Sequence, residues 1–413
     1  MPRDMVRRSG EGVAPASGRR RHGIYALYYA LFWIGPGATF PFFYPLLVAR
    51  GLHAGELGII AAVFSLAALV AQPVTGWLCD RTGRARWILF ALSLVSAALL
   101  PLFARAHGMV QETALAAVYS LANAPLGPLA DALAVAYLRE AGGEYGRLRS
   151  WGSLTFAVAG VAAGLALRAH VVDRTWLYTA GAACSVLPAV TALAFPVEVH
   201  GLSRGRSSLR QMLRARRFLL FLLLSTLALL AFNANGTYLS VYLTRLGGGS
   251  LAQGLAWAVP ALIEVPLFFG LDALRERLGL RATLVLSVAC EVSALTLIGL
   301  ARGPALALVG MALQGPAFAI FYGAAVPAVD TLVPAGLRAS GQSLLWMSCF
   351  AVGSIVANGL AGIGAVRLGL RGMYRGLAAF ALVSAVVFAV GTRGIWAAAD
   401  AAAPEPANAG DRG

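Results

Sequence analysis

The sequence predicts an all-α integral membrane protein. Of its 413 residues, 59% are hydrophobic and only 12% are charged, and the mean hydropathy is +0.74. A soluble domain is about 25% charged, so this chain has too little polar surface to cover a water-facing globule. Long apolar runs recur along the chain, and polar, arginine-rich tracts separate them.

Twelve of these runs are long enough to cross a bilayer as helices, which takes about 20 residues each. The runs are continuous rather than alternating, so they predict helices and not the strands of a barrel. The predicted spans are 24–48, 57–79, 86–105, 112–138, 146–168, 175–197, 218–243, 251–274, 281–301, 304–328, 338–364 and 374–396. Pro125 and Pro128 predict a locally irregular fourth span.

Arginine is concentrated in the tracts on one side of the predicted spans. The positive-inside rule places that side, and with it both termini, in the cytoplasm of a cell whose inner membrane holds the protein. One tract, with Arg367, Arg371 and Arg375, goes against this bias. The net charge of +15 does not indicate nucleic-acid binding, because it is spread over short tracts between spans. We expect a monomer whose surroundings are the lipid bilayer.

The polar stretch 198–217 divides the chain into two halves of six spans each. The expected parts are a basic cytoplasmic tail at 1–23, bundles at 24–197 and 218–396, this linker, and a second cytoplasmic tail at 397–413. The halves also resemble each other, since aligning Gly83 on Gly279 places Arg81 on Arg277. Internal repeats of this kind are typical of secondary transporters.

The segment GWLCDRTGRAR at 76–86 resembles the signature loop of the major facilitator superfamily, which lies between the second and third spans. That resemblance implies two six-helix bundles that move about a central site. It also implies a cytoplasmic gate in this loop. The expected gate residues are Gly76, Asp80, Arg81, Gly83 and Arg84.

The segment 128–156 resembles the lactose permease and phenylpropionate permease branch of that superfamily. The likeness joins an acid in the fourth helix to a Gly-Arg-x-Arg-x-x-Gly stretch that opens the fifth. It implies that Asp131 and Arg149 meet at the substrate. It also implies that Glu264 contacts substrate and takes part in coupling, and that the protein imports a small solute with protons. A structural ion pair between helices four and five is the alternative role for Asp131 and Arg149.

Intramembrane acids are candidates for proton coupling, because desolvation favours the protonated form of a carboxylate. We expect Glu264 to be the main proton carrier, assisted by Glu291 or Asp131. At Glu291 the sequence departs from the resembling permeases, which carry an arginine near this place.

Other polar and aromatic residues can line a site between the bundles. The polar candidates are Asn123, Asn233, Asn235, Gln314, Tyr322 and Asn358, and the candidates for stacking on a ring are Tyr28, Tyr29, Trp33, Trp151 and Trp257. The expected substrate-binding set is Asp131, Arg149, Glu264, Trp151, Asn233 and Gln314. Side chains two positions apart on a helix are rotated by about 200°, so Asn233 and Asn235 cannot share one cavity. By the same argument Arg147 faces the headgroups when Arg149 faces the site.

We therefore predict a proton-coupled symporter of a small organic solute such as an aromatic acid, a sugar or a nucleoside. The alternatives are an exporter that works by proton antiport and a non-transporting membrane sensor. No phosphate-binding loop, metal-ligand cluster or catalytic constellation is evident in the sequence, so we expect neither an enzyme nor a cofactor nor a metal.

Overall fold

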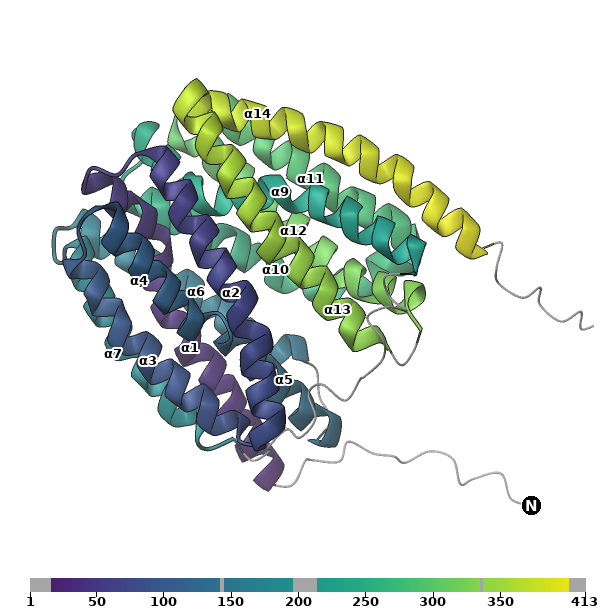
Figure 1. Ribbon diagram of the computed structural model, residues 1–413, viewed down its shortest axis with the longest axis horizontal. Helices are drawn as coiled ribbons and strands as arrows, with labels where there is room; N and C mark the ends of the chain where they lie inside the picture. The colour runs from purple at the N-terminus through teal and green to yellow at the C-terminus, as the bar shows by residue number, and fades with distance from the viewer. Residues whose placement is uncertain (1–15, 142–144, 196–213, 335–336, 401–413) are drawn as a thin grey trace, which may run out of the picture.

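The computed structural model describes residues 16–141, 145–195, 214–334 and 337–400, which form helices and their connections without a strand. Residues 1–15 and 401–413 of the expected tails, and most of the expected linker, lie outside these ranges. Figure 1 shows two groups of helices, which we call the N-half (α1–α7) and the C-half (α9–α14).

The N-half contains the first six predicted spans. Its helices are α1 (Ala16–Ala49), α2 (Ala54–Thr82), α3 (Ala85–Arg105), α4 (Gly108–Asn123), α5 (Leu126–Ala141), α6 (Tyr145–Arg168) and α7 (Arg174–Ala192). The fourth span is irregular, as predicted, and consists of α4 and α5. The break falls at Ala124 and Pro125 because proline has no N–H to continue the helix and disfavours a helical residue before it.

The C-half repeats this arrangement. It contains α9 (Arg216–Arg245), α10 (Ser250–Leu278), α11 (Leu280–Leu300), α12 (Pro304–Leu332), α13 (Arg338–Trp346), the π-helix η2 (Met347–Val352) and α14 (Gly353–Asp400). The helix α14 changes direction at Gly369, whose φ of 68° lies in the left-handed region that favours glycine. In Figure 1 it therefore supplies the end of the eleventh span and the whole of the twelfth.

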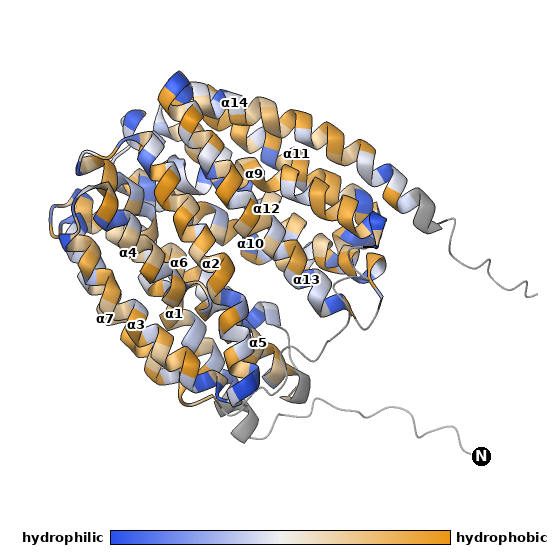
Figure 2. Cartoon of the chain, viewed as in Figure 1, coloured by the Kyte–Doolittle hydropathy of each residue, from blue (hydrophilic) through white to orange (hydrophobic). Residues whose placement is uncertain are grey.

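The helix lengths are consistent with twelve membrane passes. Ten helical stretches in the described part of the chain are long and apolar enough to span a bilayer. One of them covers the 57 residues Ser340–Trp396, which is twice the length of one pass, and it turns back at Gly369. The remaining pass is α7, which packs against α1 and α3. Hydrophilic residues gather at the helix ends, and apolar residues cover the lengths between them (Figure 2).

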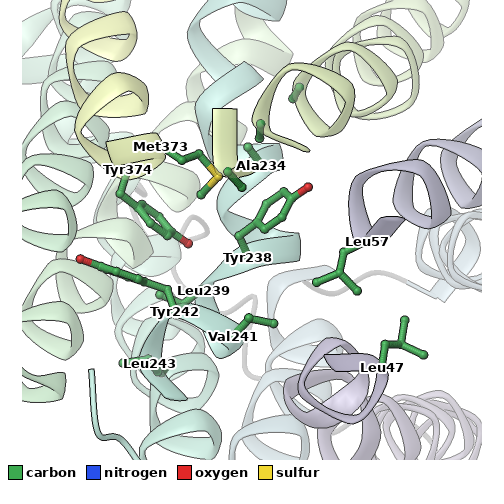
Figure 3. Close-up of a cluster of buried hydrophobic side chains, with 14 of the residues drawn as sticks. Leu47, Leu57, Ala234, Tyr238, Leu239, Val241, Tyr242, Leu243, Met373 and Tyr374 are labelled. Carbon is green, nitrogen blue, oxygen red and sulfur yellow. The ribbon is translucent and has the colours of Figure 1, made fainter. Parts of the chain in front are cut away.

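The two halves share a hydrophobic core at one end of the molecule only. Leu47 and Leu57 of the N-half and Tyr238 and Tyr374 of the C-half belong to one buried cluster, part of which is drawn in Figure 3. At the end where α1 begins and α14 finishes, which we call the terminal end, each half has a separate core. The molecule is therefore closed at the end opposite the termini, and the halves diverge towards the terminal end (Figure 1).

Small residues allow close approach of the halves at the closed end. The Ser250 hydroxyl of α10 donates to the Gly164 carbonyl of α6 at 3.1 Å, and the Tyr238 hydroxyl of α9 donates to the Ala54 carbonyl of α2 at 2.9 Å. A Cβ on Gly254 would collide with the carbonyl oxygen of Gly160. Glycine at both positions brings the α6 and α10 backbones into contact.

A buried arginine holds the closed end of the N-half together. The Arg50 guanidinium, at the end of α1, donates to Glu112 of α4 at 2.7 Å. It also donates to the carbonyls of Phe103, Ala104 and Ala106, where α3 ends. The carboxylate of Glu112 is fully buried, and Arg50 forms an ion pair with it.

The repeat predicted from the sequence is visible in the loops at the terminal end. Gly83 and Gly279 both have positive φ, at 66° and 78°, where the second and third spans of each half are joined. Arg281, which follows Gly279, donates to the Ala389 carbonyl of the twelfth span at 2.9 Å. Arg86 makes the corresponding contact with the Phe195 carbonyl in the N-half, at 3.5 Å. In each half this loop is tied to the last span of its own bundle.

Candidate functional site

Asp131 of α5 is held by tyrosines in the interior of the N-half. The Tyr29 hydroxyl of α1 donates to its Oδ1 at 2.6 Å. Tyr145, at the start of α6, contacts the Tyr29 ring edge-on with 6.4 Å between centroids and interacts electrostatically with the same carboxylate. Asp131 lies in the second turn of α5, shortly after the break between α4 and α5.

Arg149 lies one turn after Tyr145 on α6. Its guanidinium is stacked over the Trp33 ring of α1, with 4.3 Å between Cζ and the ring centroid. Among the described residues it forms no ion pair with a carboxylate. The cation is therefore positioned by an aromatic face, and its hydrogen-bond donors stay available to a ligand.

Arg147 faces away from this site, as the helical spacing predicts. Its side chain is exposed, together with Trp151. Trp151 is 50% exposed on the same apolar surface of α6 as Leu154 and Val158. The structure thus separates Trp151 from Arg149, although both belong to the expected substrate-binding set, and we leave Trp151 out of the site proposed below.

Glu264 of the C-half lies near the N-half residues described above. It is partly buried at the middle of α10, and Arg149 of α6, in the other half, acts on it electrostatically. Tyr322 of α12 interacts with both Asp131 and Arg149 in the same way. Electrostatic interactions therefore link Asp131 and Arg149 of the N-half with Tyr322 and Glu264 of the C-half, and we call this region the central site.

Aromatic side chains form the wall of the C-half beside this site. Tyr322 stacks on Trp346 with 4.7 Å between ring centroids, and Trp346 stacks on Phe350 at 5.6 Å. Phe318 contacts Tyr322 and Phe350, and further rings come from Phe232 and Phe268. All six rings are only partly buried. We call them the aromatic wall; Phe268 lies one turn after Glu264 on α10.

Glu291 and Gln314 lie elsewhere, in the core of the C-half. The Gln314 amide donates to Glu291 Oε1 at 3.3 Å and accepts from Asn235 at 2.8 Å. Tyr374 donates to Asn235 at 2.9 Å, which completes a buried polar chain. The other carboxylate oxygen of Glu291 has no partner among the described residues. Gln314 therefore positions a core carboxylate and is separate from the Arg149 site.

Asn233 and Asn235 point in different directions, as predicted. Asn233 donates to the Cys349 carbonyl at 2.8 Å, within η2. A π-helical turn leaves carbonyls without their usual partners, and the Asn233 amide satisfies one of them. This contact fixes α9 against the eleventh span.

The expected cytoplasmic gate lies where α2 meets α3. Gly83 caps α2 in the left-handed conformation, and its N–H donates to the Cys79 carbonyl at 2.8 Å. Arg81 is exposed and lies over the Trp77 ring, and Arg84 is exposed at the start of α3. A Cβ added at Gly76 would have no neighbouring atom within 4 Å. Both carboxylate oxygens of Asp80 are buried and lack a hydrogen-bond partner among the described residues.

Tyr145, Phe318, Trp346 and Phe350 were not among the residues expected at the site, whereas Tyr322 was, and their spacing in the sequence carried a signal. Tyr145 precedes Arg149 by four residues, which places the two on one face of a helix. The same spacing links Phe318 to Tyr322 and Trp346 to Phe350. Aromatic pairs at this spacing are common in helix cores, so only the tertiary structure shows that these pairs form one wall.

The fold defines the class, a multi-pass membrane transporter built from two helical bundles. The described residues contain no group of three His, Cys, Asp or Glu side chains able to hold a metal. A model of the MFS_1 like family matches residues 20–375, and the chain belongs to that family. This finding confirms the superfamily that the signature loop predicted.

The relatives of this chain include permeases and transporters. The chain is similar to the maltose permease of Geobacillus stearothermophilus, with 29% identity over 82% of this chain and 84% of that protein. It is also similar to a putative nucleoside transporter, YegT, of Escherichia coli (strain K12), with 24% identity over 80% and 81% of the two chains. The solved structure of the nucleoside transporter NupG shares the fold, with a TM-score of 0.78, 16% identity, and coverage of 90% of this chain and 99% of that one.

Proposed function

We propose that this protein is a proton-coupled symporter that takes up a small organic solute by alternating access. The observation that carries the proposal is the meeting of Asp131, Arg149 and Glu264 between the halves. One guanidinium and two carboxylates share the site. Their formal charges balance only when one carboxylate carries a proton, so protonation and solute binding affect one another.

Glu264 is the better proton carrier of the two central acids. The Asp131 carboxylate is held within its own half by a hydrogen bond of 2.6 Å from Tyr29. Glu264 has no hydrogen-bond partner among the described side chains, and it belongs to the opposite half from Arg149. Its distance from the cation therefore changes whenever the halves move, and its proton affinity changes with it. Glu291 is a second proton-accepting candidate, inside the C-half.

The solute is expected to contain a ring. The aromatic wall offers partly exposed ring faces opposite the free donors of Arg149, and stacking on such faces suits an aromatic or sugar ring. Aromatic acids, sugars and nucleosides all fit this description. The similarity to a maltose permease and to a putative nucleoside transporter supports the last two classes.

In this proposal, one conformational state explains both the closure of the end opposite the termini and the lack of a hydrogen-bond partner for Asp80 among the described residues. With the terminal end in the cytoplasm, the structure is the inward-facing state. Closure of that end then brings the loop with Arg81 and Arg84 towards the C-half, where Asp80 gains a partner. The inner membrane is the location that follows from this orientation.

Uptake into proteoliposomes with an imposed pH gradient tests the proposal. A panel of radiolabelled sugars, nucleosides and aromatic acids is first ranked by thermal shift on the purified protein. A ligand from that ranking is expected to accumulate when the lumen is alkaline. Flux out of the vesicles in exchange for protons indicates an exporter instead, and no flux for any thermal-shift ligand indicates a non-transporting sensor.

A further inference from the structure

A second buried site lies inside the N-half, on the other side of α1 from Arg149. It is a small internal pocket between α1, α3, α4 and α7, with a volume of about 20 Å³. Polar side chains from all four helices line it, and Ser93 and Ser96 among them are only 3% and 2% exposed. A pocket of this size admits one or two molecules the size of water.

Three of the hydroxyls in this pocket, those of Thr39, Ser93 and Ser185, have no hydrogen left to donate to a ligand. Thr39 donates to the Gly35 carbonyl at 2.9 Å, Ser93 to the Leu89 carbonyl at 2.7 Å, and Ser185 to the Gly181 carbonyl at 2.8 Å. Because a hydroxyl has one hydrogen and two lone pairs, each of these oxygens presents only lone pairs to the pocket.

Asn123 adds a further oxygen. Its amide nitrogen donates to the Ser96 hydroxyl at 3.0 Å, which leaves the amide oxygen as an acceptor. The lining therefore combines at least four neutral oxygen acceptors from four helices. An acceptor-rich, buried pocket is stabilised by a ligand that carries positive charge.

The break in the fourth span also favours a positively charged ligand. The helix α4 ends at Asn123, and Asn123 and Leu126, on either side of the break, both line the pocket. The C-terminal end of a helix carries a partial negative charge from its unpaired carbonyls. In secondary transporters, the C-terminal ends of interrupted helices and their freed carbonyls are places where sodium binds.

From these observations we propose that the pocket binds one small monovalent cation, sodium, through neutral oxygens of Thr39, Ser93, Asn123 and Ser185. The lining contains no carboxylate, so a divalent cation would leave two buried charges uncompensated. Bound sodium ties α1, through Thr39, to α3, α4 and α7, and Phe32 of α1 also lines the pocket. The next residue, Trp33, carries the Arg149 guanidinium. Sodium thus stabilises the segment of α1 that positions the central cation, independently of which solute the protein carries.

Thermal unfolding of the purified wild-type protein in sodium, lithium, potassium and choline chloride at constant ionic strength tests the site. Sodium is expected to raise the melting temperature saturably, and choline is expected to leave it unchanged. Ser93→Ala removes one ligand and is expected to raise the half-saturating sodium concentration about tenfold. Identical unfolding curves in sodium and choline for the wild type overturn the proposal and indicate a pocket that holds water only.

Two further variants provide a matched control and an independent test of the sodium site. Ser293→Ala is the matched control, because that hydroxyl makes the same bond within its own helix, to Ala289 at 2.9 Å, on an exposed face. Its sodium response is expected to equal that of the wild type. Asn123→Asp adds a carboxylate to the pocket and is expected to lower the half-saturating concentration about tenfold. If Ser93→Ala does not fold, an unchanged sodium response in Asn123→Asp contradicts the site. None of these measurements requires transport, so their failure leaves the proposed symport untouched.

Discussion

Replacing Gly254 with leucine is expected to open the end of the molecule at which the two halves share a core. Gly254 lies on α10 where its backbone meets that of α6. A Cβ at this position collides with the Gly160 carbonyl oxygen, which belongs to a helix backbone and cannot move like a flexible side chain. The clash exists only while this end is closed, so the substitution raises the free energy of the closed arrangement selectively.

Overpacking of a tight contact costs about 1–3 kcal/mol. Applied to an equilibrium between two conformations, that cost changes the population ratio by about 5- to 150-fold in favour of the state open at this end. The leucine side chain is larger than the Cβ that already collides, so the upper part of the range is expected.

Two pairs of spin labels report the change by pulsed electron resonance. One pair is placed at His53 and Arg302, in exposed loops at the closed end, and the other at Arg84 and Arg277, at the terminal end. In Gly254→Leu the first pair is expected to lengthen and the second to shorten. Gly270→Leu is the control on the same helix, because nothing lies within 4 Å of a Cβ there. Unchanged distances in a folded Gly254→Leu protein refute the claim that the close contact of Gly254 with Gly160 is needed for closure of this end.

Three further predictions concern the side chains described above. Arg149→Lys is expected to lose transport almost completely, since lysine lacks the planar fork that stacks on Trp33; near-normal uptake of the identified solute reduces Arg149 to a topological role. Tyr322→Leu is expected to weaken solute binding by about 1–2 kcal/mol through loss of a ring face, measured by calorimetry, whereas Tyr322→Phe is expected to bind almost normally. Glu112→Gln leaves Arg50 buried without its counter-charge, which is expected to cost about 3–5 kcal/mol of stability; a thermal unfolding curve like that of the wild type contradicts this.

Local sequence patterns were sufficient to predict the spans and the directions in which some side chains point. Apolar run length predicted the helices, Pro125 predicted the irregular fourth span, and the helical repeat separated Arg147 from Arg149 and Asn233 from Asn235. These features depend on residues near one another in the chain, where proline geometry and the turn angle of a helix decide the outcome.

Local patterns could not predict the parts of the site that depend on packing between helices far apart in the chain. Gln314 and Glu291 are intramembrane polar residues like Glu264, but the structure places them in the core of the C-half. Helical spacing tells which residues share a face, and it does not tell which helix that face meets. For the same reason neither the aromatic wall nor the π-helical turn at Met347–Val352 was predicted.

The central claim is that Glu264 carries the proton that drives uptake, and its most direct test uses Glu264→Gln in proteoliposomes. Glutamine keeps the size of the side chain and cannot exchange a proton. The variant is expected to exchange external labelled solute for internal unlabelled solute while failing to accumulate the solute when the lumen is alkaline. Full pH-driven accumulation in Glu264→Gln contradicts the account.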